Sequence, residues 1–204
     1  MAFDTYTNLK TALANFLARD DLTSHIPDFI SLAEARMSRE LDTRSQEKRA
    51  TATLGSGSEF VSLPTDLRAI RLVKINSNPL KVLDYNSPEN YYEKYPNNQG
   101  GNPEIYTIVG AEIGFRPIPS SSLTAEIIYG EDISSLSDSN LTNTILTRHP
   151  DAYLYGSLSQ AYIFLMDENR VAQYDTLFTR VIEEIKKDTQ TSRFSSGALA
   201  MQQA

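Results

Sequence analysis

The residues best suited to chemistry are two histidines and three pairs of adjacent acidic residues. His25 and His149 each lack a second histidine nearby, whereas a metal site needs His, Asp or Glu ligands clustered at helical or hairpin spacing. Each histidine is therefore expected to cap a helix or to lie on the surface. Glu183 and Glu184 do not form a catalytic dyad, because adjacent residues on a helix point in different directions. The other pairs are Asp20-Asp21 and Glu131-Asp132, and nothing singles out two carboxylates of the glycosidase kind.

Glycine motifs and cysteines add no catalytic pattern. Gly156-Ser157 lies in a predicted amphipathic helix, not at the strand-to-helix turn of a nucleophile elbow. Gly55-x-Gly57 does not complete a dinucleotide-binding fingerprint, and no P-loop lysine follows it. The absence of cysteine excludes disulfides and zinc–thiolate sites. We therefore predict no enzyme activity, no metal and no cofactor.

Composition predicts a folded, acidic protein. Of the 204 residues, 40% are hydrophobic and 22% are charged, and the formal net charge is -7. Such a chain is poorly suited to grip nucleic-acid phosphates through a basic face. The start, MAFDTYTNLK, has no signal-peptide pattern, and no apolar run approaches the ~18 residues of a membrane span. We expect a soluble protein that is made and used in the cytoplasm.

Three segments have the apolar spacing of α-helices. They are residues 5–18, a segment from Pro27 to Leu41, and the long segment from Pro150 to Lys187. In the second, the outer side is expected to be solvated and carries Glu34, Arg36, Arg39 and Glu40. In the third, the polar run 167–169 separates two apolar stripes, which predicts a helical hairpin or one long bent helix.

Gly156 is unusual within this long segment, because a mid-helix glycine costs roughly 1 kcal/mol relative to alanine. With Ala152 and Ser159 it forms a strip of small residues that lets another backbone approach closely. Two interpretations stay open: close packing within the same chain, and contact with a neighbouring subunit.

Between the helical segments the residue types favour strands. Residues around Thr51 and Thr53 are predicted to pair with Phe60 and Val61 across a hairpin loop at 55–58. The other expected elements are strands at 70–75, 80–85 and 125–129, a short helix at 89–95, and a hairpin joining 105–109 to 112–116 through Gly110-Ala111. Residues 131–146 are polar and loop-like.

This order of elements predicts an α+β fold rather than a parallel doubly wound sheet. The N- and C-terminal helices are expected to form one bundle with an antiparallel β module inserted between them. The expected divisions are 1–48 for the first helices, 49–148 for the β module, 149–190 for the C-terminal helical hairpin and 191–204 for a flexible tail. The tail lacks a repeating apolar face, so it is disordered alone or ordered by a partner.

Three pieces of sequence, taken in order, carry a family resemblance. They are IPDFISLAEARMSRELDTR followed by FVSLPTDL, then NPEIYTIVGAEIGFRPIP, then HPDAYLYGSLSQAYIF. Together they resemble the head–tail adaptor (connector) proteins of tailed bacteriophages over about residues 5–190. The resemblance implies a virion structural protein, assembled in the host cytoplasm, that forms a closed ring beneath the portal. Such rings are commonly twelvefold, extend the DNA channel and dock the tail.

The resemblance also implies partners: other copies of the chain, the portal protein and a downstream tail or neck protein, with no membrane. DNA is expected to pass through the lumen without specific binding, because a negative lumen repels phosphates. We hypothesise that residues 191–204 anchor the chain to the portal. The candidate residues are Arg193, Phe194, Leu199 and Met201, whose apolar members would each gain by burial between portal subunits.

Two other classes of function stay open. One is a cytoplasmic α+β module that binds a small ligand or a protein without catalysis, with the ligand over Tyr91, Tyr92 and Tyr95. The other is an unrecognised hydrolase. The 11 tyrosines do not decide between them, because tyrosine is common both at interfaces and in cores.

Overall fold

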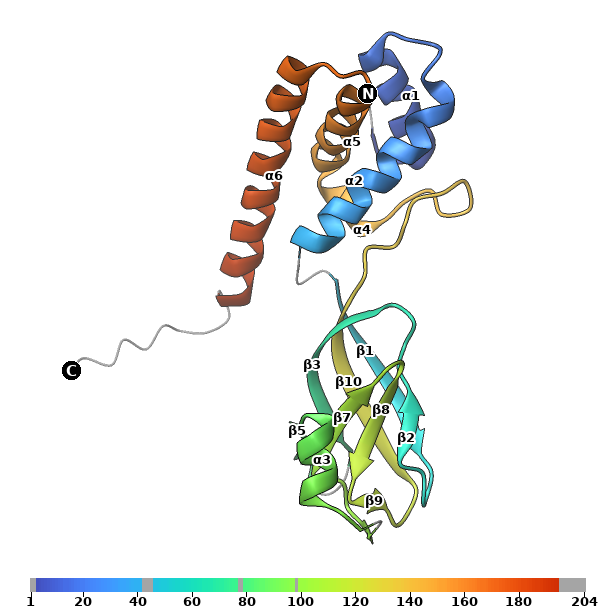
Figure 1. Ribbon diagram of the computed structural model, residues 1–204, viewed down its shortest axis with the longest axis vertical. Coiled ribbons are helices and arrows are strands. Elements are labelled where there is room, and N and C mark those ends of the chain that lie inside the picture. Colours follow the sequence, from blue (N-terminus) through green and yellow to red (C-terminus); the bar gives the residue numbers. More distant parts are fainter. Residues whose placement is uncertain (1–2, 42–45, 77–78, 98, 195–204) are drawn as a thin grey trace, which may run out of the picture. The chain divides into compact units, whose positions relative to one another are not determined.

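The computed structural model describes residues 3–41, 46–76, 79–97 and 99–194. The chain divides into two compact units (Figure 1). The helical unit combines Met1–Gln46 with Ile133–Ala204, and the β unit is Glu47–Asp132. Helices from both ends of the chain thus share one unit and strands fill the other, which confirms the predicted α+β fold.

The predicted helices are present in the helical unit. Its α-helices are α1 (Tyr6–Leu17), α2 (Ile26–Glu40), α4 (Thr144–Arg148), α5 (Pro150–Phe164) and α6 (Glu168–Phe194). Thr5 caps α1, where its hydroxyl accepts a hydrogen bond from the Asn8 backbone N–H at 3.3 Å. Pro27 and Pro150 lie in the first turns of α2 and α5, where a missing N–H leaves no hydrogen bond unmade.

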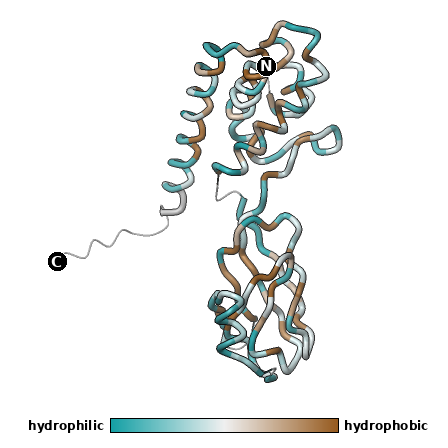
Figure 2. Tube along the Cα trace, viewed as in Figure 1, coloured by the Kyte–Doolittle hydropathy of each residue, from teal (hydrophilic) through white to brown (hydrophobic). Residues whose placement is uncertain are grey.

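Helix α5 is the centre of the helical unit. It contacts α1, α2, α4 and α6, and nine of its fifteen residues are buried. A helix that is apolar on nearly every side belongs in a core. Helix α6 differs, since hydrophobic and hydrophilic residues alternate along it (Figure 2). It buries Phe178, Ile182 and Ile185 on one face and exposes charged residues on the other.

The segment from Pro150 to Lys187 is a helical hairpin rather than one bent helix. Helix α5 ends at Phe164 and α6 begins at Glu168. Between them Met166 has a φ angle of 56°, in the left-handed region that breaks a right-handed helix. Helix α6 then continues to Phe194, past the end expected at Lys187.

The β unit is built from two sheets that share one core. The first has the order β1 (Glu47–Leu54), β10 (Leu123–Glu131), β3 (Leu67–Ile75), β4 (Lys81–Val82), and its pairs are antiparallel. The second has the order β2 (Phe60–Ser62), β8 (Glu112–Arg116), β7 (Ile105–Val109), β5 (Asp84–Tyr85). Val73 and Ile127 of the first sheet and Phe115 of the second lie in the same apolar cluster. The sheets therefore form a sandwich.

Two strand predictions need correction. The predicted hairpin across residues 55–58 is wrong: β1 pairs with β10 and β2 pairs with β8, so the two strands lie in different sheets. The predicted strand at 80–85 is split, because β4 pairs with β3 whereas β5 pairs with β7. The chain changes sheets at Leu83, which is buried. Strand propensity gives no information about which partner a strand takes.

Other parts of the β unit follow the prediction more closely. The hairpin joining β7 to β8 at Gly110 is confirmed, as is the short helix, α3 (Pro88–Lys94). Two short pairs are parallel rather than antiparallel. They are β5 with β7, which flank α3 in the chain, and β6 (Gly100–Gly101) with β9 (Ile118–Pro119).

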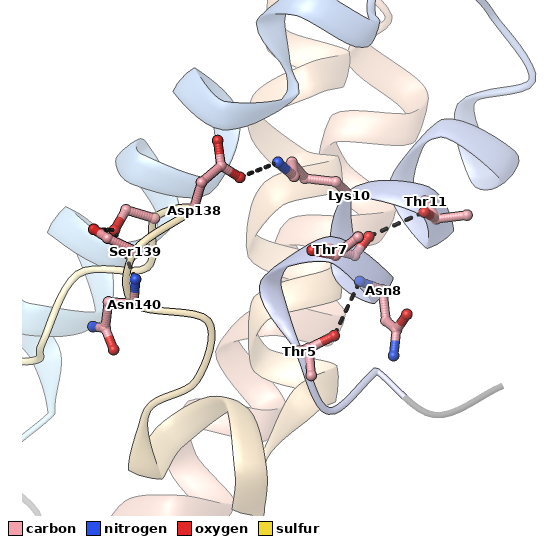
Figure 3. Close-up of polar contacts among 9 residues, drawn as sticks. Thr5, Thr7, Asn8, Lys10, Thr11, Asp138, Ser139 and Asn140 are labelled. Atoms are coloured by element: carbon pink, nitrogen blue, oxygen red, sulfur yellow. Dashed lines mark hydrogen bonds and ion pairs between the residues drawn. The ribbon is translucent and has the colours of Figure 1, made fainter.

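Residues from Ile133 to Arg148 belong to the helical unit, although the sequence analysis grouped them with the strands. The backbone N–H of Tyr6 donates to the carbonyl of Leu141 at 2.7 Å. Lys10 of α1 forms an ion pair with Asp138 at 2.7 Å (Figure 3). These bonds tie the segment to α1, and most of it is loop until α4 begins at Thr144.

Candidate interaction surfaces

The residues first considered for chemistry do not come together. Within the described ranges, no group of three or more His, Cys, Asp or Glu residues is placed to hold a metal ion. His25 is exposed and its ring packs on Phe164, with centroids 5.2 Å apart. His149 precedes α5 and is half-buried, and burial lowers its pKa. Glu184 is exposed and pairs with Arg180 on α6.

Membrane-spanning segments are also missing from the part of the chain that is described. None of its helices combines the length and the apolar character that a bilayer span requires.

The predicted portal-binding residues fall at the limit of the described chain. Helix α6 includes the backbone of Arg193 and Phe194, but their side chains lie outside the described residues. Leu199 and Met201 lie wholly outside them. The tail hypothesis therefore stays a prediction.

The small-residue strip on α5 is buried within the helical unit. Ala152, Gly156 and Ser159 are all buried. A Cβ atom added at Gly156 would come within 2.9 Å of Cε2 of Phe178 on α6 and 3.1 Å of Cβ of Ala33 on α2. At Gly156, then, the elements that approach α5 are helices of the same chain.

Glu34 is a buried carboxylate, which corrects the expectation of a solvated side chain. Its Oε1 accepts hydrogen bonds from the Leu136 N–H at 2.8 Å and the Tyr153 hydroxyl at 2.9 Å. That hydroxyl also accepts from Nδ2 of Asn143 at 2.5 Å. Burial raises the pKa of Glu34. The sequence did contain a signal for this burial: Glu34 lies four residues after Ile30, and that helical spacing puts it on the apolar face of α2.

The tyrosine cluster of the β unit packs around an arginine. Arg116 donates to Oε1 of Glu59 at 2.8 Å, and the Tyr91 hydroxyl donates to the same oxygen at 3.1 Å. The Arg116 guanidinium carbon lies 5.0 Å from the ring centroid of Tyr91 and 4.5 Å from that of Tyr92. Arg116 also donates to the carbonyl of Tyr95. The chain's own arginine therefore covers two of the three rings proposed as a ligand surface, those of Tyr91 and Tyr92.

Large apolar side chains are exposed where α5 turns into α6. Ile163 is 52% exposed, Phe164 53% and Met166 89%, and we call these three residues the apical patch. The Phe164 ring also contacts Phe29 of α2, with centroids 5.7 Å apart. Phe29 is itself buried, so on this side the patch is bordered by the exposed ring of His25, which packs on Phe164.

The β unit has an open edge between its two sheets. Strands β1 and β2 are the outermost strands of their sheets, and a cavity of about 230 Å³ lies beside them. Ala50 and Ala52 of β1 line it together with Val61 of β2 and Phe115 of β8. Two alanines at inward positions leave room that larger side chains would fill.

A family model described as the SU10 adaptor protein matches residues 4–202 of the chain. The chain belongs to this family. The match confirms the resemblance to phage head–tail adaptors, and it spans both units. Comparison with curated proteins finds no matching relative.

Membership of the SU10 adaptor family gives the chain a structural role in a phage virion, in association with other head and tail proteins. The three sequence pieces that carry the resemblance lie in both units: α2 and β2, the β7–β8 hairpin, and α5. They contribute to the two cores, as Met37, Phe115 and Leu158 show. They therefore help to specify the fold of each unit.

Proposed function

We propose that this chain is the head–tail adaptor that docks as a ring on the portal, extends the DNA channel and provides the attachment site for the tail. The observation that carries the proposal is the SU10 adaptor match, which covers residues 4–202. Twelve copies, the number common in the connectors it resembles, would assemble in the host cytoplasm and remain in the virion neck.

The distribution of charge supports a conduit through which DNA passes without specific binding. The helical unit has fifteen acidic and eleven basic residues, and the β unit has eleven acidic and eight basic residues. Neither unit is basic as a whole. A lumen lined by such units repels phosphates and lets DNA slide.

The portal contact is assigned to the end of the chain. Arg193 and Phe194 stand at the end of α6, and Leu199 and Met201 follow in a neutral segment of small residues. Buried between portal subunits, each apolar side chain would contribute about 1.5–3 kcal/mol. A contact repeated around a ring gains further strength by avidity.

Native mass spectrometry of the chain alone and with the purified portal ring of the same phage tests this function. We expect a complex in which a ring of adaptor copies is bound to one portal ring. Deletion of 191–204 should abolish that complex without changing the melting temperature. A chain that does not associate with the portal ring at all would refute the proposal.

A sharper variant of the tail test leaves α6 intact. Replacing Leu199 and Met201 by serine removes only the apolar side chains, and replacing Gln202 and Gln203 by serine is the matched control. Lost portal binding in the first variant alone supports the anchor. Equal binding by both variants refutes the assignment of the anchor to Leu199 and Met201.

The cavity of the β unit supports a second candidate function, a small-ligand or protein-binding module. Its lining is mostly apolar, and about 230 Å³ is slightly below the usual range for small-molecule pockets. Replacing Ala52, which is half-buried, by leucine would fill the cavity. If that variant assembled on the portal as the parent does but lost a ligand that co-purifies with the parent, the second function would hold.

A further inference from the structure

The two ends of helix α6 are too far apart to bind the same site on a partner. The helix has 27 residues, which at about 1.5 Å per residue separates its ends by roughly 40 Å. The apical patch lies where α6 begins, and the proposed portal anchor lies where it ends. If the C-terminal end is held by the portal, the apical patch is left for a different partner.

Met166 is the residue of the apical patch whose side chain contributes least to the fold. It is 89% exposed, so its apolar side chain buries almost nothing in the chain. Its φ of 56° is also a conformation in which glycine or asparagine is the less strained choice. A large apolar side chain held in this way stabilises nothing in the isolated chain, whereas it offers a protruding contact to a partner.

Acidic groups border the apical patch. Glu168 is exposed two residues after Met166, and the 75% exposed Asp28 side chain lies 3.8 Å from Nδ1 of His25, whose ring packs on Phe164. The nearby Arg170 already pairs with Asp167 and donates to the Tyr162 hydroxyl. The border therefore carries more negative than positive charge.

This charge selects the kind of partner. A protein surface with apolar side chains bordered by lysine or arginine is complementary to the patch. A second copy in a two-fold contact would place carboxylates opposite carboxylates, whereas a neighbouring copy in a ring would present a different face, which the measurement of ring formation below tests. We propose that the apical patch is the docking surface for the downstream tail protein, through apolar side chains with a basic border. This inference rests on the proposed adaptor function.

A head–tail joining reaction tests the inference. DNA-filled capsids that carry the portal but lack this adaptor are mixed with purified adaptor, and then with isolated tails from the same phage. Sedimentation measures adaptor bound to capsids, and the titre of infectious particles measures tail attachment. Met166→Gly should bind capsids as the parent does, while its joining falls roughly tenfold or more at limiting tail concentration.

Ala18→Gly is the matched control, because Ala18 is the other described non-glycine residue with positive φ, at 51°. Both changes relieve a left-handed backbone, but only the first removes an apolar side chain of the patch. A second pair of variants tests the border: Asp28→Lys with Glu168→Lys should weaken joining. The control is Glu183→Lys with Asp188→Lys, which changes the charge equally at exposed sites elsewhere. This double variant should leave joining unchanged.

Each outcome decides between specific alternatives. If parent adaptor does not bind capsids, the adaptor function itself fails. If the parent joins and Met166→Gly joins equally well, the apical patch is not the tail site. Loss of capsid binding by Met166→Gly would place the portal at the patch and overturn the inference. Loss of ring formation in the isolated variant would place a second copy there, with the same consequence.

Discussion

Each unit places a carboxylate beside a tyrosine hydroxyl, buried for Glu34 and half-buried for Glu59, but only the β unit adds a cation. In the helical unit, Glu34 accepts from Tyr153 and a backbone N–H. In the β unit, Glu59 accepts from Tyr91 and also from Arg116. The Arg116 side chain is only 5% exposed and that of Glu59 is 18% exposed.

The difference shows two ways to keep a carboxylate out of water. Beside Arg116 the negative charge of Glu59 is compensated, so removal of the arginine leaves a half-buried charge alone. Glu34 has neutral donors instead, and its burial raises its pKa, which favours the protonated form. The first cluster is therefore sensitive to loss of a partner and the second to pH.

The largest expected effect is that of Arg116→Met. It removes the ion pair to Glu59, the bond to the Tyr95 carbonyl and the cation over two tyrosine rings. Loss of one partner of a fully buried pair costs about 3–5 kcal/mol, and the half-buried position of Glu59 reduces that cost. Hydrogen-exchange mass spectrometry should show faster exchange in residues 47–132 and unchanged protection of α5.

The double variant Glu59→Gln with Arg116→Met sharpens this result. It removes the charge that the single variant leaves unpaired, so part of the lost stability should return. If Arg116→Met alone leaves exchange in the β unit unchanged, the cluster contributes nothing and the contrast between the units is wrong.

The next largest effect concerns one glycine in each unit that leaves little room for a side chain. Gly156 faces Phe178, which is fully buried, whereas Gly114 faces Phe60 on the short edge strand β2, which is half-buried. Gly156→Leu should cost about 1–3 kcal/mol by overpacking, measured as a lower urea midpoint of the helical signal in circular dichroism. Gly114→Ala should cost less, because it adds a single carbon and Phe60 can move toward solvent, although the buried Tyr91 hydroxyl, 2.9 Å from the new Cβ, must also shift. A Gly156→Leu variant that melts and assembles like the parent would show that α5 tolerates the larger side chain.

The sequence predicted the helices better than the strand partners, for a physical reason. A helix is specified by the spacing of its own residues, as in α2 and α5. A strand takes its partner from elsewhere in the chain, so the alternation around Thr51 and Val61 did not reveal that β1 and β2 lie in different sheets. The hairpin at Gly110 was the exception, because a two-residue turn fixes its own register.

The candidate surfaces were predictable to a smaller extent. Gly156 was recognised because glycine is rare within a helix, and its neighbours on α2 and α6 needed the structure. The exposure of Met166 could not be predicted, since an apolar residue after an apolar stripe is expected to be buried. The link between Glu34 and Tyr153 joins residues far apart in sequence, which no local pattern reports.

The smallest expected effect is the pH dependence that Glu34 adds to stability, because it involves one ionisation. Burial raises its pKa in the folded protein above the usual value of 4.5. Between the unfolded and folded pKa values, the folded state therefore binds more protons than the unfolded state. Stability from this group is fully present at low pH and is lost as pH rises through the folded pKa.

Urea unfolding of the parent and of Glu34→Gln over a series of pH values measures this contribution. The amide keeps an oxygen for the Leu136 N–H and the Tyr153 hydroxyl but cannot ionise in this range. The free energy of unfolding of the parent, relative to the variant, should fall as pH rises above about 4.5 and then level off. Parallel curves for the parent and Glu34→Gln would mean that Glu34 has the same pKa in both states, and the contrast with the arginine-paired cluster would disappear.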